Sequence, residues 1–113
     1  MHIVSKKWGQ ERWIRNDEKY CMKELLVIPG TKCSLHAHKI KTETFYVVSG
    51  MVKMFVRPVG KTGTEVVMCP GQTVHIEPGT YHRFEAVCPA ILLECSTQHF
   101  DEDSYRLEPS CKI

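Results

Sequence analysis

Proline and glycine divide the chain into short segments, and this spacing restricts the possible fold more than any other feature of the sequence. Each interruption is a place where the fixed φ of proline or a positive φ of glycine favours a turn. The intervening runs are rich in Val, Ile, Phe, Tyr and Leu, and they show no helical periodicity. They predict strands at about 25–28, 34–38, 43–48, 51–57, 64–68, 73–77, 82–87 and 90–96. This rhythm indicates an all-β sandwich or barrel.

The stretch from Gly30 to Gly50 carries a pattern of metal-ligating side chains. His36 and His38 are separated by one residue, and four residues separate His38 from Glu43. Alternate side chains of a strand share a face, so the two histidines point the same way, and a chain reversal could return Glu43 beside them. Two imidazoles and a carboxylate suit a divalent metal. A fourth candidate ligand, His82, begins another strand-like run after a proline-glycine turn.

Strand parity predicts that these ligands lie in an apolar pocket. If Glu43 faces inward, Phe45 lies on the same face two residues later. The same step of two leads from His82 to Phe84. Small-molecule sites are usually apolar apart from a few polar groups. Phe45 and Phe84 are therefore predicted to line a substrate pocket.

The spacing in this stretch resembles the first motif of the cupin superfamily, G-x5-H-x-H-x3,4-E-x6-G, which is matched at every fixed position. The second motif, G-x5-P-x-G-x2-H-x3-N, is matched in part, because Glu77 replaces its proline and Ala86 its asparagine. The resemblance implies an all-β jelly-roll barrel, also called a double-stranded β-helix, and a metal bound by four side chains. These are His36, His38, Glu43 and His82.

A finer resemblance extends over nearly the whole chain. The sequence is similar to the cupin module of type II mannose-6-phosphate isomerases, a module usually fused to a GDP-mannose pyrophosphorylase. Where that family typically has an arginine two positions before the glutamate, this chain has Lys41, and D-lyxose isomerases look similar in having a lysine there. Other shared marks are Lys7-Trp8-Gly9, Tyr20 with Lys23, Val47-Val48-Ser49-Gly50, Gly79-Thr80 with His82-Arg83, and Asp101-Glu102-Asp103 followed by Arg106-Leu107-Glu108.

The resemblance implies a metal-dependent enzyme that interconverts an aldose and a ketose, with a small sugar or sugar phosphate as substrate. Zinc, manganese, iron or nickel would fit the ligand set. A coordinated carboxylate is held by its cation, so the base should be a second group, and Glu94 and Lys41 are the candidates. Glu94 lies in an otherwise apolar run, where burial would tune a carboxylate for proton transfer. Lys23 or Arg83 could bind a phosphate.

Two other functions fit the same residues. Three histidines and one glutamate also suit ferrous iron in cupin dioxygenases, where vacant coordination positions admit dioxygen and an organic substrate. A non-catalytic carbohydrate-binding cupin would keep the pocket and lack turnover. Iron-dependent oxygen uptake would identify the dioxygenase, and saturable sugar binding without turnover would identify the binding module.

Length and charge restrict the organisation of the chain and its partners. At 113 residues with 42% hydrophobic content, the chain suffices for a single domain over 1–113. A formal charge of +2 without a dense basic run argues against nucleic acid as a partner. The amino terminus has no apolar signal-like region, and no segment approaches the roughly 20 apolar residues of a membrane span. We therefore expect a cytoplasmic protein with no membrane partner. We also expect a homodimer, in which the amino-terminal segment adds an edge strand to the partner.

The six cysteines are expected to be free thiols, because they include no C-x-x-C pair and follow no secretory signal. Cys33, Cys88 and Cys95 lie in or beside apolar runs, where a thiol serves as a small hydrophobe. A catalytic thiol is the alternative, and Cys33 is the candidate because it precedes His36 by three residues and could lie near the mouth of the site.

Ordinary structural positions are expected for the remaining conspicuous residues. Hydrogen-bonded or surface positions are predicted for His2, His75 and His99. Trp8 and Trp13 are expected to cover the barrel rather than to stack against a ligand. The tail after Ser96 is polar and is expected to pack over the outside, with the acidic run 101–103 as a solvated face.

Overall fold

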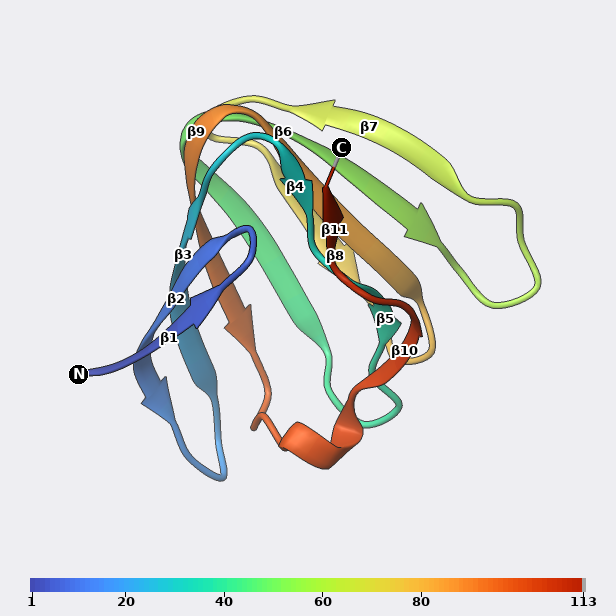
Figure 1. Cartoon of the computed structure of the whole chain (residues 1–113). Helices are drawn as coiled ribbons and strands as arrows, with labels where there is room; N and C mark the ends of the chain where they lie inside the picture. Colours follow the sequence, from blue (N-terminus) through green and yellow to red (C-terminus); the bar gives the residue numbers. More distant parts are fainter. Residues whose placement is uncertain (113) are drawn as a thin grey trace.

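A computed structural model describes residues 1–112 and shows a β-sheet that curls around a core (Figure 1). Within that range the strands form an 11-stranded sheet, and no helix is long and apolar enough to cross a membrane. The expected all-β fold is confirmed. The elements are β1 (His2–Lys6), β2 (Gly9–Asn16), β3 (Cys21–Val27), β4 (Thr31–Lys32), β5 (Leu35–Ala37), β6 (Glu43–Arg57), β7 (Thr64–Met68), β8 (Thr73–Ile76), β9 (Tyr81–Ser96), the 3-10 turn η1 (Asp101–Asp103), β10 (Tyr105–Glu108) and β11 (Cys111–Lys112).

Two long strands, β6 and β9, form the centre of the fold. They pair antiparallel along most of their length, with register shifts in the middle of the ladder. The sequence predicted a break in each strand, and both predictions are wrong because the irregularity is absorbed within the ladder. Gly50 has a φ of 80°, and a Cβ there would overlap the carbonyl oxygen of Pro89. The glycine therefore permits a bulge and a close approach of β9 where a turn was expected.

The amino-terminal part of the chain adds three strands beside β9. β3 pairs with β9, β2 pairs with β3, and β1 pairs with β2 of the same chain. The sequence did not predict β2, because its run Gly9–Asn16 is dominated by polar and charged residues. The other edge of β1 has no partner strand within residues 1–112. The expected addition of this edge to a second subunit stays a prediction.

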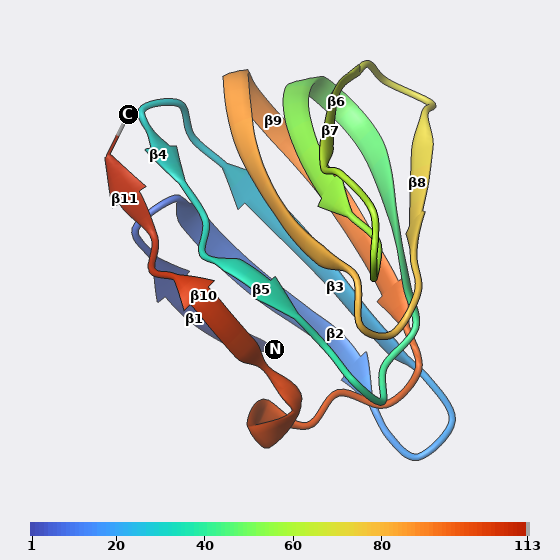
Figure 2. The ribbon, with the colours of Figure 1, turned by 90° about the vertical axis from the view of Figure 1, so that its right-hand side faces the viewer.

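The carboxy-terminal tail extends the sheet. β10 pairs with β5 and β11 pairs with β4, so the tail lies alongside two inner strands (Figure 2). The expectation that it packs over the outside is wrong, because its backbone joins the ladder itself. The turn η1 precedes β10, and its Asp103 is 2% exposed. The expectation that 101–103 form a solvated face is therefore wrong for Asp103, which faces inward.

The core lies between the inward faces of β3, β6 and β9, along which burial alternates as strand parity predicts. Trp8, expected to cover the barrel, is buried and packs edge-to-face on Phe84 with ring centroids 5.0 Å apart. Cys33 is buried as expected. Cys88 and Cys95 are exposed instead, because they lie on the part of β9 that faces away from the core.

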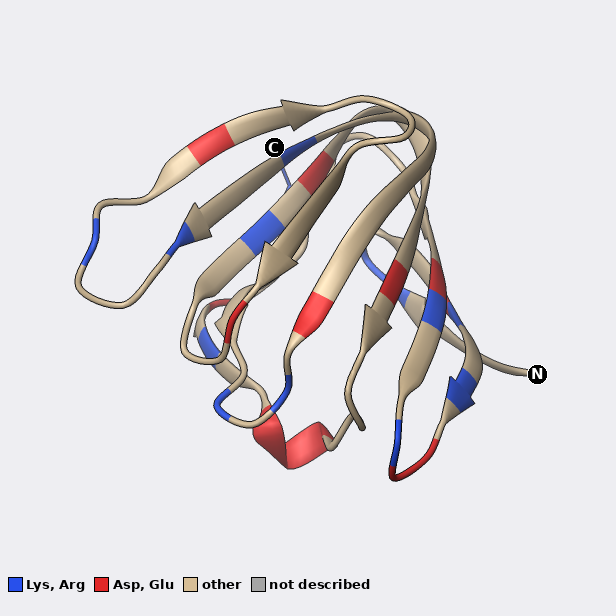
Figure 3. Cartoon of the chain, turned by 180° about the vertical axis from the view of Figure 1, so that it is seen from behind, with Lys and Arg blue, Asp and Glu red and all other residues tan. Residues whose placement is uncertain are grey.

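Charged residues of both signs are distributed over the strands. Figure 3 shows Lys and Arg interspersed with Asp and Glu on this side of the molecule, and the three acidic residues of η1 together at one end. This distribution agrees with the formal charge of +2.

Candidate metal centre

Three histidines converge at one point of the sheet. His36 lies on β5, His38 follows that strand, and His82 lies on β9 directly opposite His36 in the ladder. One ring nitrogen from each lies within 4.8 Å of the others. The pairing of β5 with β9 therefore brings together side chains that are far apart in the sequence, in the group that the sequence predicted as ligands.

The backbone fixes the orientation of each ring. Every Nδ1 lies within hydrogen-bonding distance of a backbone carbonyl oxygen, which can only accept, so each Nδ1 donates. In a neutral ring the other nitrogen then has a free lone pair, which is the form that binds metal ions. The contacts are His36 Nδ1 to Ser34 O (2.9 Å), His38 Nδ1 to Asp103 O (2.9 Å) and His82 Nδ1 to Thr80 O (3.1 Å).

Glu43, the first residue of β6, completes the group. Its Oε2 lies 3.1 Å from His82 Nε2 and 3.3 Å from His38 Nε2. In this tautomer neither Nε2 carries a hydrogen, so the carboxylate oxygen of Glu43 faces two other hydrogen-bond acceptors. Glu43 Oε2 and His82 Nε2 are buried and lack a hydrogen-bond partner within residues 1–112. A cation among these atoms would satisfy all of them, so three imidazoles and one carboxylate fit a divalent metal.

The charge states of these groups agree with metal binding. Burial and the neighbouring imidazole of His82 lower the pKa of His36 to about 3, so the ring is neutral at neutral pH. Burial opposes ionisation of Glu43, but the nearby charge of Lys41 favours it, and the pKa of Glu43 lies well below its ordinary value. The site thus offers a neutral imidazole at His36 and an ionised carboxylate at Glu43.

A second cluster of buried charges adjoins the ligands. Lys41 Nζ lies 3.2 Å from Glu94 Oε2 and 3.7 Å from Glu43 Oε1. Lys23 Nζ lies 3.7 Å from the same Glu94 oxygen and 3.9 Å from the ring centroid of Trp13. Lys23 and Lys41 are each 2% exposed and Glu94 is 6% exposed. Both predicted catalytic residues are therefore beside the candidate metal site, and Lys23 contacts one of them.

The ion pairs determine which group can act as an acid. Burial alone would lower the pKa of Lys41, but the charges of Glu94 and Glu43 outweigh burial and raise it. Lys41 is therefore an ammonium ion at neutral pH and can donate protons. This leaves Glu94 as the better candidate for a base.

His99, which was predicted only to be hydrogen-bonded or on the surface, joins the cluster. Its Nδ1 lies 2.9 Å from Lys41 Nζ, and its Nε2 lies 3.0 Å from Asp101 Oδ1. Burial, followed by the charges of Lys23 and Lys41, lowers the pKa of His99. No spacing rule links His99 to the motif, because it lies beyond the last long strand, and only the folded chain brings it to Lys41.

Asp103 is a further residue that the sequence did not identify. Its carboxylate accepts hydrogen bonds from the backbone N–H groups of Lys39, Ile40 and Lys41. Its own backbone carbonyl orients His38. Asp103 therefore holds the segment that connects the histidine pair to Glu43 and that carries Lys41.

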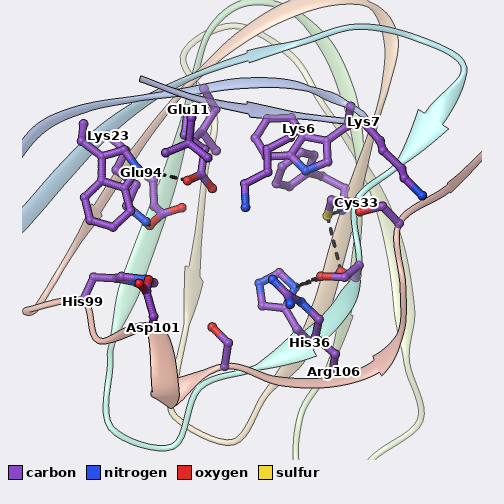
Figure 4. Close-up of a pocket in the computed structure, with 18 of the residues that line it drawn as sticks. Lys6, Lys7, Glu11, Lys23, Cys33, His36, Glu94, His99, Asp101 and Arg106 are labelled. Atoms are coloured by element: carbon purple, nitrogen blue, oxygen red, sulfur yellow. Dashed lines mark hydrogen bonds and ion pairs between the residues drawn. The ribbon is translucent and has the colours of Figure 1, made fainter. Parts of the chain in front are cut away.

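A cavity of about 840 Å³ opens beside these groups (Figure 4). Phe45 and Phe84 line it, as the sequence predicted, together with Trp8, Trp13, Lys23 and Leu25. In Figure 4, His36 and Cys33 lie on one side, whereas Lys23, Glu94, His99 and Asp101 lie on the other. The cavity has the size usual for small-molecule sites, about 300–1,000 Å³.

Two residues considered as functional candidates are unsuited to the roles considered for them. Burial raises the pKa of the Cys33 thiol to about 12, so Cys33 is not a nucleophile at neutral pH although it lines the cavity. Arg83 pairs with Glu108 at 3.0 Å and donates to the carbonyl oxygen of Cys33, beside a separate groove of about 230 Å³. Arg83 therefore does not face the large cavity.

Comparison with known proteins shows similarity to sugar isomerases. D-lyxose ketol-isomerase of Thermofilum sp. is 32% identical over 120 residues, which cover 86% of this chain and 67% of that protein. D-lyxose/D-mannose isomerase of Thermosediminibacter oceani is 30% identical over 111 residues, which cover 79% of this chain and 61% of that protein. This chain thus spans about two thirds of the length of these relatives.

Longer proteins contain a region similar to this chain. A Vibrio cholerae protein named as a mannose-1-phosphate guanylyltransferase is 30% identical over 105 residues, which cover 89% of this chain and 22% of that protein. The structure of oxalate decarboxylase from Bacillus subtilis superposes with a TM-score of 0.85 at 18% identity, over 94% of this chain and 30% of that one. The sequence profile of the cupin domain matches residues 23–94, a range that includes the three converging histidines and Glu43. The chain belongs to the cupin family.

Proposed function

We propose that this protein is a metal-dependent isomerase that interconverts an aldose and a ketose. The observation that carries the proposal is the buried pair of Glu94 and Lys41 beside the candidate metal ligands. Isomerisation needs a base that moves a proton between two carbons of the open-chain sugar and an acid that serves the neighbouring oxygens. Relatives named as D-lyxose and D-mannose isomerases support the same reaction for this chain.

Glu94 moves the carbon-bound proton. Its carboxylate removes the proton from C2 of the aldose and returns it to C1, while Lys41 protonates the oxygen at C1 and recovers a proton from the hydroxyl at C2. Protons and electrons balance over this cycle, and the aldose becomes the ketose. Lys23 and Lys41 both contact Glu94 Oε2, which leaves Oε1 without an ion-pair partner among residues 1–112.

The residues His36, His38, Glu43 and His82 hold the metal in this proposal. A divalent cation bound there supplies Lewis acidity to the carbonyl and hydroxyl oxygens of the sugar. Phe45 and Phe84 exclude water from the reacting carbons, and this strengthens the electrostatic effect of Lys41.

The charge of the cavity wall supports a substrate with an anionic group, such as a sugar phosphate. Lys6 from β1 and Arg106 from β10 line the cavity, and Arg106 lies opposite His36 in the ladder (Figure 4). Neither side chain has an ion-pair partner within the described part of the chain. Lys23 is less suited to this task than the sequence indicated, because it contacts Glu94 and Trp13.

The test is an isomerase assay with purified protein loaded in turn with zinc, manganese, iron and nickel. D-lyxose and D-mannose are assayed beside D-mannose 6-phosphate, and ketose formation is measured. We expect turnover with at least one sugar and a loss of at least about 100-fold in kcat for Glu94→Gln. The matched control is Glu85→Gln, the same substitution on the outward face of the same strand.

Other results would contradict the proposal. Iron-dependent oxygen uptake without ketose formation would identify a dioxygenase. Saturable sugar binding without turnover, unchanged by Glu94→Gln, would identify a binding module. Metal content that survives the double substitution His36→Ala/His38→Ala would remove the metal site from the proposal.

We also propose a homodimer formed through the free edge of β1. Sedimentation equilibrium tests it, and a species near 13.0 kDa at all concentrations would refute it.

A further inference from the structure

We propose that His99 is a positioning residue that directs the ammonium group of Lys41 toward the reacting oxygens. The inference rests on the proposed function, because it assigns a role within the same cavity. His99 touches neither the candidate metal ligand Glu43 nor Glu94 through a hydrogen bond; its polar contacts are with Lys41, Asp101 and Asn16.

The backbone of His99 is anchored to a distant strand. Its N–H donates to Asn16 Oδ1 at 2.8 Å, and its carbonyl oxygen accepts from Asn16 Nδ2 at 3.0 Å. Asn16 is the last residue of β2. Both backbone groups of His99 are therefore held by one side chain, and the residue has a fixed place between β9 and η1.

The ring of His99 lies edge-on to His38, with ring centroids 6.2 Å apart, and is held by three further contacts. It packs edge-on against Trp13, with centroids 5.1 Å apart and an interplanar angle of 88°. Its Nδ1 faces Lys41 Nζ at 2.9 Å, and its Nε2 faces Asp101 Oδ1 at 3.0 Å. An ammonium group has no acceptor, so Nδ1 must accept and Nε2 must carry the hydrogen that goes to Asp101. The contacts thus define one tautomer of a neutral ring.

This arrangement accounts for the donors of Lys41. An ammonium group has three N–H bonds. Glu94 Oε2 at 3.2 Å and His99 Nδ1 at 2.9 Å take two of them. Glu43 Oε1, at 3.7 Å, is too distant for a good hydrogen bond, so the third donor remains available on the side of the metal ligands. That is where the sugar oxygens lie in the proposed reaction.

Removal of His99 would free Lys41 to approach the two carboxylates. Without the acceptor at His99 Nδ1, Glu94 and Glu43 alone would attract the ammonium group of Lys41, which would then settle between the two carboxylates. The third donor would then be occupied by Glu43. The expected consequence is a slower chemical step with little change in substrate affinity, because misplacement of a catalytic group by about 1 Å can cost about 100-fold in rate.

Three substitutions separate this role from a structural one. His99→Asn places its amide oxygen near the position of Nδ1 and keeps the acceptor for Lys41. His99→Gln reaches the position of Nε2 and loses that acceptor, and His99→Phe keeps a ring on Trp13 without either nitrogen. We expect kcat to fall about 10- to 100-fold in the Gln and Phe variants and to recover to within about 5-fold of wild type in Asn, with KM changed less than about 3-fold throughout.

A second measurement does not depend on turnover. The Nζ resonance of Lys41, assigned in ¹⁵N-lysine protein by its absence from Lys41→Met, should move in His99→Phe and His99→Gln and stay near the wild-type position in His99→Asn. If the wild type lacks isomerase activity, the proposed function fails, and this resonance still decides whether His99 positions Lys41. An unchanged Lys41 resonance in His99→Phe, or equal kcat in the Phe, Gln and Asn variants, would overturn the inference. Bound metal and thermal midpoint, measured on every variant, should match the wild type.

Discussion

Replacement of Asp103 by asparagine should destabilise the protein through the segment that carries Lys41. The Asp103 carboxylate accepts from the N–H groups of Lys39 and Ile40 at Oδ1 and from those of Ile40 and Lys41 at Oδ2, at 2.9–3.2 Å. The residue is buried, so these hydrogen bonds form away from water. The carboxylate therefore stabilises three consecutive backbone donors that no strand partner among residues 1–112 satisfies.

The magnitude follows from the number of hydrogen bonds lost. An amide keeps one oxygen, which can serve Lys39 and Ile40, but its NH₂ group then faces the N–H of Lys41. At least one hydrogen bond to a charged group is lost, at a cost of about 1.5–3 kcal/mol. With a urea m-value of about 1.5 kcal/mol/M, a loss of about 2 kcal/mol lowers the unfolding midpoint by about 1.3 M. Asp103→Ala removes both oxygens and should cost about 3–5 kcal/mol.

Urea titration of the metal-free protein, followed by tryptophan fluorescence, measures this effect. Glu102→Gln is the control, because Glu102 is the exposed neighbour and its substitution should change the free energy of unfolding by less than about 0.5 kcal/mol. If Asp103→Asn unfolds at the same urea concentration as Glu102→Gln, with an unchanged m-value, the reasoning about this carboxylate is refuted.

Three other predictions can be checked with simple variants or reagents. Gly50→Ala should destabilise the protein by at least about 2 kcal/mol, because φ is 80° and the new Cβ would lie 2.6 Å from Ala90 Cα. Gly60→Ala is the control, because a Cβ at Gly60 would enter open space. Equal urea midpoints for the two variants would contradict this prediction. Iodoacetamide at pH 8 should modify the exposed Cys88, Cys95 and Cys111 and spare Cys33, whose pKa is raised to about 12. Intact-mass and peptide analysis measures the labelling of each thiol, and early labelling of Cys33 would disprove the prediction. His36, with a pKa lowered to about 3, stays neutral in the metal-free folded state while an unfolded histidine gains a proton below about pH 6.5. The unfolded state thus binds more protons between these values, so metal-free wild type should lose stability from pH 7 to pH 4 more steeply than His36→Gln; parallel losses would show that His36 does not contribute.

The motif residues could be predicted because strand geometry has a simple period. The shared face of His36 and His38 and that of Glu43 and Phe45 follow from that period, whereas the return of the chain to Glu43 was supported by the resemblance to the cupin motif. For Glu94 the apolar run left two alternatives, a buried and paired carboxylate or one that faces solvent, and the structure shows the first. The shared faces needed only local spacing.

Other parts of the site depend on contacts that local spacing does not contain. His99 and Asp103 are separated from Lys41 by 58 and 62 residues, and they reach it only because the tail turns back beside β5. A run of acidic residues is usually solvated, and nothing within 101–103 marks the third residue as the one that caps a remote segment. The exposed thiols Cys88 and Cys95 were misjudged for a related reason, because apolar neighbours do not reveal which face of a strand a residue takes across a bulge.

The pairing of β10 with β5 also has a consequence for how the protein matures. A nascent chain that has reached Ser96 already contains all four candidate ligands, but it lacks Asp103, whose carbonyl orients His38 over a separation of 65 residues. Contacts of such long range form late, because distant parts of the chain must first meet. Metal capture is therefore expected only after the segment through Asp103 has been synthesised and has paired with β5.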